Sequence, residues 1–284
     1  MGLQIATNVS ALNAYRNLSS TQNDLSKSLE KLSSGLRINR AADDAAGLAI
    51  SEGLRSQVNG LNVAARNAQD GISVIQTAEG ALTEVHAILQ RVRDLAVQAG
   101  NDSNNTESRA AITTEVTQLV DELERIADST NFNGIQLLDG TGGTAGVLSF
   151  QVGADGDASS QISVDLTSAD IKTLATDLRT DIVTTDGFAD AAAAAATITR
   201  IDTDIEAVST ARADLGAVQN RFESTINSLQ VAAENLAAAN SRIRDTDMAA
   251  EMVRFTSANI LQQAGTAMLA QANQSGQGIL QLLR

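Results

Sequence analysis

Residues 45–99 read AAGLAISEGLRSQVNGLNVAARNAQDGISVIQTAEGALTEVHAILQRVRDLAVQA and decide the fold, because their apolar side chains recur every seven positions. The main row is Leu54, Leu61, Ala68, Ile75, Leu82, Leu89 and Ala96. A heptad repeat sustained this long without proline predicts one uninterrupted helix that lays a continuous apolar seam against partner helices. At 1.5 Å per residue this helix is roughly 80 Å long, so we expect an elongated helical protein.

Further helices are predicted over residues 4–36, 106–128, about 197–241 and 247–283. The third of these carries heptads of its own and is the expected seam partner, through Ile201, Val208, Leu215, Phe222, Leu229 and Leu236. The polar turn at 100–105 makes the helices on either side of it antiparallel neighbours. The first and last helices are too polar to be stable alone, and we expect them to pair with each other as a coiled coil.

Between these helices the pattern changes from helix to strand. Asn133-Gly134 is a turn dipeptide, and LSFQVG and QISVDL flank the turn ADGDASS, which predicts a β-hairpin at about 147–166. The Thr/Asp/Ala-rich segment at about 167–196 is predicted to be a short, weakly determined insert, and removing about 168–190 is expected to leave assembly intact. The fold class is therefore mainly α: an elongated antiparallel helical bundle with a small β-hairpin.

Composition excludes several classes of protein. The chain has no Cys, Pro or Trp and a net charge of −14, which argues against disulfides, Cys-ligated metals and nucleic-acid binding. It has no apolar run long enough for a membrane span. The N-terminus does not resemble an ordinary secretory signal, so the residues alone favour a cytoplasmic protein.

No catalytic, cofactor or metal site is predicted, and we do not expect an enzyme. The common nucleotide, zinc-protease and hydrolase motifs are absent. His86 is the single histidine and is expected at the surface or seam edge. The pair Asp155 and Asp157 lacks the twelfth-position Glu of an EF-hand. Asp43-Asp44 and Asp245-Thr246-Asp247 stand where terminal helices meet the bundle, which favours capping or a junction salt bridge.

Several long segments resemble bacterial flagellin in order and spacing. They include LSSGLRINRAADDAAGLAISEGLRSQVNGLNVAARNAQDGISVIQTAEGAL (32–82), LQRVRDLAVQAGN (89–101), NFNGIQLL (131–138), FQVGADGD (150–157), RADLGAVQNRFESTI (212–226) and ILQQAGTAMLAQANQSGQGILQLLR (260–284). The resemblance implies a structural subunit that self-assembles into the flagellar filament for motility. Residues 1–40 and 243–284 would be D0-like helices of an inner tube. Residues 41–242 would be a D1-like outer bundle, without large outer domains.

The resemblance also implies a location and partners. It implies export through the flagellar type III apparatus to the extracellular filament, which replaces the cytoplasmic expectation. The implied partners are further copies of the chain, an export chaperone on about 247–284, the filament cap and hook-junction proteins, and host Toll-like receptor 5. The terminal residues expected to serve assembly and chaperone binding are Met248, Met252, Phe255, Ile260, Leu261, Met268, Leu269, Ile279, Leu282 and Leu283.

The positions that match the receptor contacts of flagellins are Arg91, Leu95 and Glu115. Arg91 and Leu95 share a helix face, and an antiparallel hairpin about Ser103 brings Glu115 level with Arg91. Leu95 lies beside the main apolar row, so we expect it to be partly exposed and to serve as an anchor. Without the resemblance, an ordinary ion pair between helices explains the same residues. Arg40 and Asp43 are candidates for contacts between subunits, although capping within the chain predicts them too.

Three alternatives stay open at this point. A hook–filament junction protein would share the terminal helices but usually departs from the flagellin pattern in the D1 helices. Another secreted helical-bundle protein would share the heptads alone. An amphipathic membrane-acting translocator would explain the termini, but it should carry a more continuous apolar hairpin.

Overall fold

The computed structural model describes residues 8–184 and 187–282, and the chain divides into two compact units. One unit is formed by residues 1–58 and 234–284, and the other by residues 59–233. The helices are α1 (Val9–Ser34), α2 (Ala45–Ala99), α3 (Thr106–Ser129), α4 (Ile171–Arg179), α5 (Ala191–Arg244) and α6 (Met248–Leu282). The units divide inside α2 and α5. The mainly α fold is confirmed, as is the long uninterrupted helix at 45–99.

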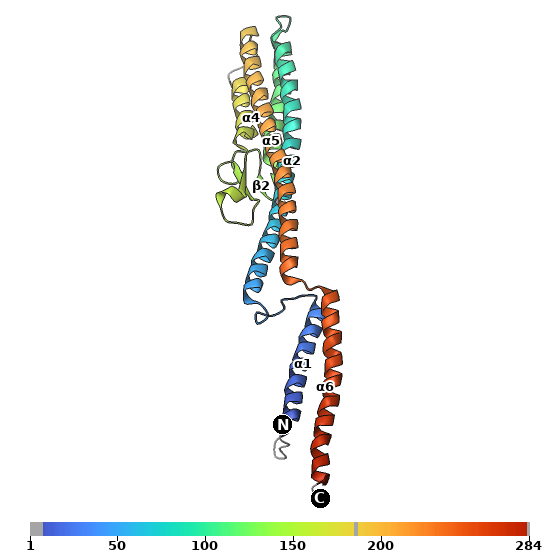
Figure 1. Cartoon of the computed structure of the whole chain (residues 1–284). Coiled ribbons are helices and arrows are strands. Elements are labelled where there is room, and N and C mark those ends of the chain that lie inside the picture. The colour runs from blue at the N-terminus through green and yellow to red at the C-terminus, as the bar shows by residue number, and fades with distance from the viewer. Residues whose placement is uncertain (1–7, 185–186, 283–284) are drawn as a thin grey trace. The chain divides into compact units, whose positions relative to one another are not determined.

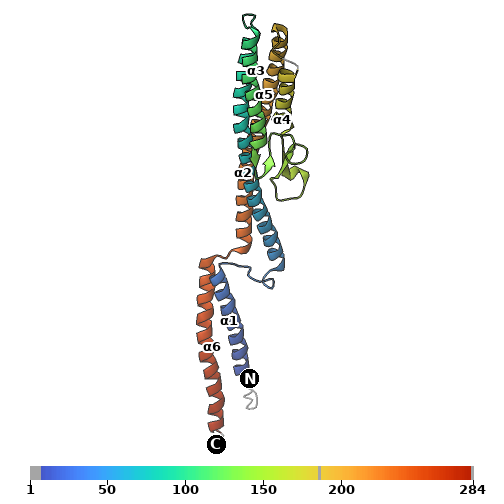
Figure 2. The same ribbon diagram turned by 180° about the vertical axis from the view of Figure 1, so that it is seen from behind.

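The core of the unit formed by residues 59–233 is the seam that the heptads predict. The α2 row is fully buried from Ala68 to Ala96, and it packs with α5 and α3 in one cluster. Two ion pairs are consistent with the antiparallel course of α2 and α5, because Arg212 lies 3.7 Å from Glu79 and Arg93 lies 2.5 Å from Asp202. Figure 2 shows α3 and α5 along α2. Two helices therefore contact α2 in this unit.

Two antiparallel strand pairs follow α3. Strands β1 (Asn131–Phe132) and β2 (Ile135–Gln136) are joined by Asn133 and Gly134, both with positive φ, which confirms the predicted turn. Strands β3 (Val147–Gln151) and β4 (Gln161–Asp165) form the hairpin predicted at 147–166. The hairpin reaches the core through Phe150, whose ring meets Phe222 edge-on with centroids 5.7 Å apart.

The structure corrects the description of the segment 167–196 as weakly determined. Its residues form a short 3-10 helix η2 (Thr167–Ala169), helix α4, the π-helix η3 (Thr180–Thr184) and the start of α5, and several side chains are fully buried in the core: Ile171, Ala175, Leu178, Ile182 and Phe188. Another 3-10 helix, η1 (Ala158–Ser160), precedes β4. Helix α4 has nine residues, too few for a repeating apolar pattern to identify it from the sequence. The segment is part of the core.

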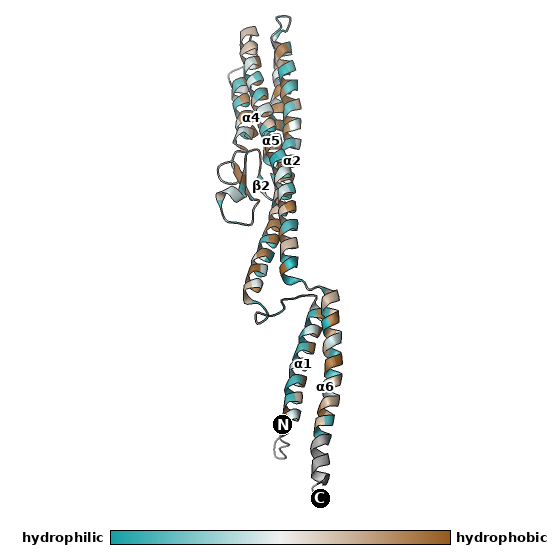
Figure 3. Ribbon diagram, viewed as in Figure 1, coloured by the Kyte–Doolittle hydropathy of each residue, from teal (hydrophilic) through white to brown (hydrophobic). Residues whose placement is uncertain are grey.

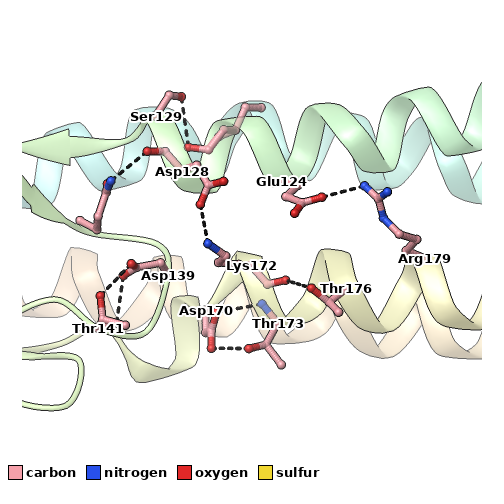
Figure 4. A network of polar contacts seen from close by, with 12 residues as sticks. Glu124, Asp128, Ser129, Asp139, Thr141, Asp170, Lys172, Thr173, Thr176 and Arg179 are labelled. Atoms are coloured by element: carbon pink, nitrogen blue, oxygen red, sulfur yellow. Dashed lines mark hydrogen bonds and ion pairs between the residues drawn. The ribbon is translucent and has the colours of Figure 1, made fainter.

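Polar contacts also hold α4 against α3. Lys172 Nζ lies 2.8 Å from an Asp128 carboxylate oxygen, and Arg179 reaches Glu124 at 2.7 Å and Asp121 at 2.5 Å. Figure 4 shows Lys172 reaching Asp128 and Arg179 reaching Glu124 between the two helices, with Asp170 capping α4 through Thr173. The contacts are partly exposed, so each contributes little to stability, and the buried apolar side chains position the helix.

In the other unit, α1 and α6 pack side by side and run antiparallel (Figure 1). Asn8 Nδ2 donates to the Ala272 carbonyl oxygen at 2.9 Å, and Gln262 Nε2 donates to Gln22 Oε1 at 2.5 Å. The expected pairing of the terminal helices is confirmed. Helix α6 begins at Met248, one residue later than predicted. Across both described ranges, no helix is long and apolar enough to cross a membrane.

Candidate assembly and receptor surfaces

One stripe of α6 faces α1. It runs through Ala258, Gln262, Gly265 and Ala272, at spacings of four, three and seven residues, which keep one side of a helix in a coiled-coil seam. Gly265 lies so close to Leu18 that a Cβ there would be 3.2 Å from a Leu18 methyl carbon. The small residues of the stripe let the two helices approach closely.

Large apolar side chains also occur on α6 outside this stripe, and no described residue of their own unit covers them. Six large side chains on α6 remain between 47% and 68% exposed: Met248, Met252, Val253, Ile260, Leu261 and Met268. We call these six residues, which lie around the helix outside the stripe that faces α1, the outer face of α6. Part of it is a groove lined by Met252, Val253, Thr256, Ser257 and Ile260. Figure 3 shows apolar residues recurring along α6. Clustered exposed apolar side chains on a soluble protein mark an interaction surface, so we expect a partner to cover these residues.

Most of the terminal candidates from the sequence fall on this helix. Five of them belong to the outer face, and Phe255 and Leu269 are half-buried. Ile279 and Leu282 lie within α6, but their side chains are outside the described part of the structure, and Leu283 lies outside the described residues altogether. Sequence reasoning missed Val253, which lines the same groove.

The junction candidates Arg40 and Asp43 make contacts within their own chain. Asp43 Oδ2 accepts from the backbone N–H of Arg40 at 3.0 Å and of Asn39 at 3.2 Å, and these bonds lower the pKa of Asp43 below its usual range. Arg40 Nε donates to Glu30 Oε1 at 2.7 Å, and the pKa of Glu30 is lowered mainly by this bond. Asp43 therefore holds the turn at residues 39–43, and the neighbouring Asp44 caps α2 by accepting from Gly47 N–H at 2.9 Å. The guanidinium of Arg40 stays largely exposed.

Sequence reasoning missed the contact that ties the two connecting segments together at this junction. Leu36 and Asp245 form an antiparallel β-bridge, in which Arg37 N–H donates to the Arg244 carbonyl at 2.6 Å. The Arg37 guanidinium also donates to the Ile243 carbonyl at 2.6 Å. Single residues in extended conformation give no periodic signal, so only the fold brings these segments together.

Arg91 and Glu115 lie level with each other on α2 and α3, as the predicted hairpin requires. Arg91 Nη2 lies 2.6 Å from Glu115 Oε1, and its Nε lies 3.1 Å from the same oxygen. Both side chains are exposed. The chain therefore presents this pair to solvent.

The expectation that Leu95 is partly exposed is wrong. Leu95 is only 2% exposed and belongs to the core cluster. Its side chain lies beside the Leu89/Ala96 row, but α2 is contacted by α3 as well as α5, so the buried arc of α2 is wider than one row. Leu95 supports the surface that carries Arg91 and does not form part of it.

A cluster of charges on α4, η3 and α5 was also not foreseen. Arg200 lies 3.0 Å from Asp177, 3.3 Å from Asp204 and 3.9 Å from Asp181. Asp204 is buried, and Oδ2 has no hydrogen-bond partner. Burial raises the pKa of Asp204, and the nearby Arg200 only partly offsets this effect. Within the described residues, no group of three His, Asp or Glu side chains is placed to hold a metal ion.

Comparisons with known proteins place this chain in a family. The bacterial flagellin N-terminal helical region matches residues 5–142, and the C-terminal helical region matches residues 198–283. A flagellin of Halalkalibacterium halodurans is 54% identical over 98% of both chains. A flagellar filament 33 kDa core protein of Treponema phagedenis is 48% identical, again over 98% of both chains.

A solved structure from Vibrio parahaemolyticus, provisionally described as a flagellar hook-associated protein, shares the fold. It has a TM-score of 0.56 and 16% identity, and it covers 72% of this chain and all of that one. At this identity the likeness concerns the fold alone, whereas the family matches extend over both ends of the sequence. The chain belongs to the bacterial flagellin family, structural proteins that polymerise into the flagellar filament and are not enzymes.

Proposed function

We propose that this filament subunit assembles through its paired terminal helices, with the outer face of α6 as the main contact with neighbouring copies. The carrying observation is that six large apolar side chains stay about half exposed after α1 has packed. In this proposal residues 1–40 and 243–284 line the inner tube and residues 41–242 form the outer one. The α6 contact would remove the largest apolar surface of the terminal pair from water.

The energy available from this face is of the size that assembly requires. Full burial of a large apolar side chain stabilises by about 1.5–3 kcal/mol, so burying the exposed half of six such side chains yields roughly 4–9 kcal/mol. Association costs at least about 4 kcal/mol in lost translational and rotational freedom. The outer face therefore offsets most of this cost, and weakening it should raise the critical concentration of the monomer.

A matched pair of variants tests the proposal. Val253→Ser changes a valine that is 68% exposed on α6, and Val231→Ser changes one that is 59% exposed on α5. We expect Val253→Ser, and more strongly Ile260→Ser with Leu261→Ser, to raise the critical concentration measured by sedimentation and electron microscopy. Val231→Ser should leave it near the wild-type value. Equal effects of the two valine variants would contradict the proposal, and circular dichroism of each monomer controls for lost helix.

We also propose that host Toll-like receptor 5 recognises the exposed Arg91–Glu115 pair. What favours it is the position of both charged groups at the surface, at the residues that match the receptor contacts of flagellins. Leu95 acts indirectly, by holding α2 against its neighbours. We further propose that the pair is covered between subunits of the filament, so that the monomer signals and the intact filament does not.

A receptor reporter assay on monomers tests this second proposal. Arg91→Ala and Glu115→Ala should lower signalling without lowering the melting temperature, whereas Leu95→Ala should lower both. The exposed Glu122–Arg125 pair on α3, also 2.6 Å apart, is the matched control, and Arg125→Ala should signal normally. Unchanged signalling by the Arg91 and Glu115 variants, or full activity of cross-linked filaments, would refute the assignment.

The remaining partners follow from the same family. We propose that the chain is secreted through the flagellar export apparatus and that an export chaperone covers the outer face of α6 before assembly. Contacts with the cap and hook-junction proteins belong to the same proposal. Co-purification of the wild type, but not of the Ile260→Ser and Leu261→Ser variant, with a flagellar chaperone would support it. Equal capture of both would place the chaperone elsewhere.

A further inference from the structure

The methionines of this chain are concentrated on one helix, α6, at exposed positions outside its contact with α1. The sequence has four, and three of them, Met248, Met252 and Met268, stand on the outer face of α6. They are 47%, 51% and 64% exposed. Residues 59–233, which build the larger core, contain none. The thioethers are therefore absent from the core of that unit, where methionine commonly fills gaps, and concentrated where a partner is expected.

We propose that Met248, Met252 and Met268 form an oxidation site at which a peroxide converts the unassembled subunit into one that does not join the filament. The inference rests on the proposed role of the outer face of α6 in assembly. Susceptibility of methionine to oxidation follows its exposure to solvent, and these three thioethers are open to it in the single chain. In the filament the same atoms would be covered by neighbouring copies.

The chemistry needs only a peroxide and the thioether. The sulfur uses a lone pair to attack one peroxide oxygen, so a sulfur–oxygen bond forms as the oxygen–oxygen bond breaks. The departing hydroxide takes the proton from the hydroxyl now bound to sulfur and leaves as water. The sulfur is oxidised to a sulfoxide, the peroxide is reduced, and a sulfoxide reductase returns the side chain to methionine.

The product is poorly suited to the surface on which it forms. A sulfoxide is polar and accepts hydrogen bonds, whereas Met252 shares its groove with Val253 and Ile260. The nearby Thr256 hydroxyl already donates to the Met252 carbonyl oxygen at 2.8 Å and is not free to satisfy the new oxygen. Burying an unsatisfied polar group opposes association. We expect each sulfoxide to raise the critical concentration about tenfold.

The experiment uses full-length monomer treated with hydrogen peroxide. Mass spectrometry measures sulfoxide at each methionine, and seeded polymerisation measures the critical concentration. A variant with Met248→Leu, Met252→Leu and Met268→Leu keeps the volume and helix preference of the side chains and retains Met1 as its only methionine. We expect peroxide to block the wild type and spare this variant, and sulfoxide reductases to restore wild-type assembly. Assembled filaments should be oxidised more slowly at all three positions.

The remaining outcomes distinguish a failure of the oxidation proposal from a failure of the assembly proposal. Normal polymerisation of fully oxidised wild type, or equal loss in the leucine variant, would overturn the oxidation site. Equal oxidation rates in monomer and filament would overturn its restriction to the unassembled subunit. If the unoxidised Ile260→Ser and Leu261→Ser variant polymerises normally, the proposed assembly face is wrong. If that variant fails while oxidised wild type assembles, only the oxidation inference is wrong.

Discussion

Replacing Leu178 with alanine tests whether the segment after the hairpin belongs to the core. Leu178 is on α4 and has no exposed surface. Removing most of a fully buried leucine side chain costs about 2–5 kcal/mol through lost burial and the cavity left behind. Domains of this kind are stable by only about 5–15 kcal/mol, so the loss is a large fraction of the total. It corresponds to a fall in melting temperature of roughly 5–20 °C.

Thermal unfolding followed by circular dichroism measures the effect. Thr176→Ala on the same helix is the control, because that side chain is exposed and donates only to the Lys172 carbonyl. It should shift the melting temperature by a few degrees at most. Deleting residues 168–190 removes the buried side chains of Ile171, Leu178, Ile182 and Phe188, whose burial stabilises the fold by roughly 6–12 kcal/mol. We therefore expect the deletion to unfold this unit, whereas the sequence alone predicted that it would be tolerated. Equal melting temperatures for Leu178→Ala and Thr176→Ala would refute the reasoning.

Three further predictions concern packing and charge. Gly71→Ala should lower the free energy of unfolding in urea by about 1–3 kcal/mol, because the added Cβ would lie 2.8 Å from the Phe222 ring. Gly80 is the control: it is exposed and has no neighbour within 4 Å, so Gly80→Ala should not lower it. Asp204→Asn should stabilise at neutral pH, since a raised pKa means that folding disfavours the carboxylate. This advantage should shrink as the pH falls and Asp204 becomes protonated, and a constant difference would contradict it. Asp43→Ala should speed hydrogen exchange at the amides of residues 39 and 40 at neutral pH, with the difference lost as the pH falls through the lowered pKa of Asp43. Unchanged exchange at neutral pH would contradict the role of Asp43 in holding this turn.

The sequence by itself determined the long helices, their antiparallel order and the hairpin. Heptads persist over α2 and α5 because one continuous strip of each helix is buried, and burial selects apolar residues at the helical period. Turn residues fixed the connections, as Asn133-Gly134 shows. The sequence also determined that Glu115 lies at the same height as Arg91, because a short turn between two regular helices leaves only one register. Each of these features depends on local sequence alone.

Only the tertiary structure decided how much of each helix surface is buried by neighbouring elements. Leu95 lies beside the predicted row and is nevertheless buried, because a second helix contacts α2, and no pattern within α2 records the width of that contact. Helix α4 is too short to show a period, and its buried side chains are apolar only at the few positions that meet the core. The six residues of the outer face of α6 are exposed because they lie outside the stripe on which α1 packs. Burial depends on which elements meet, and that is settled by the fold as a whole.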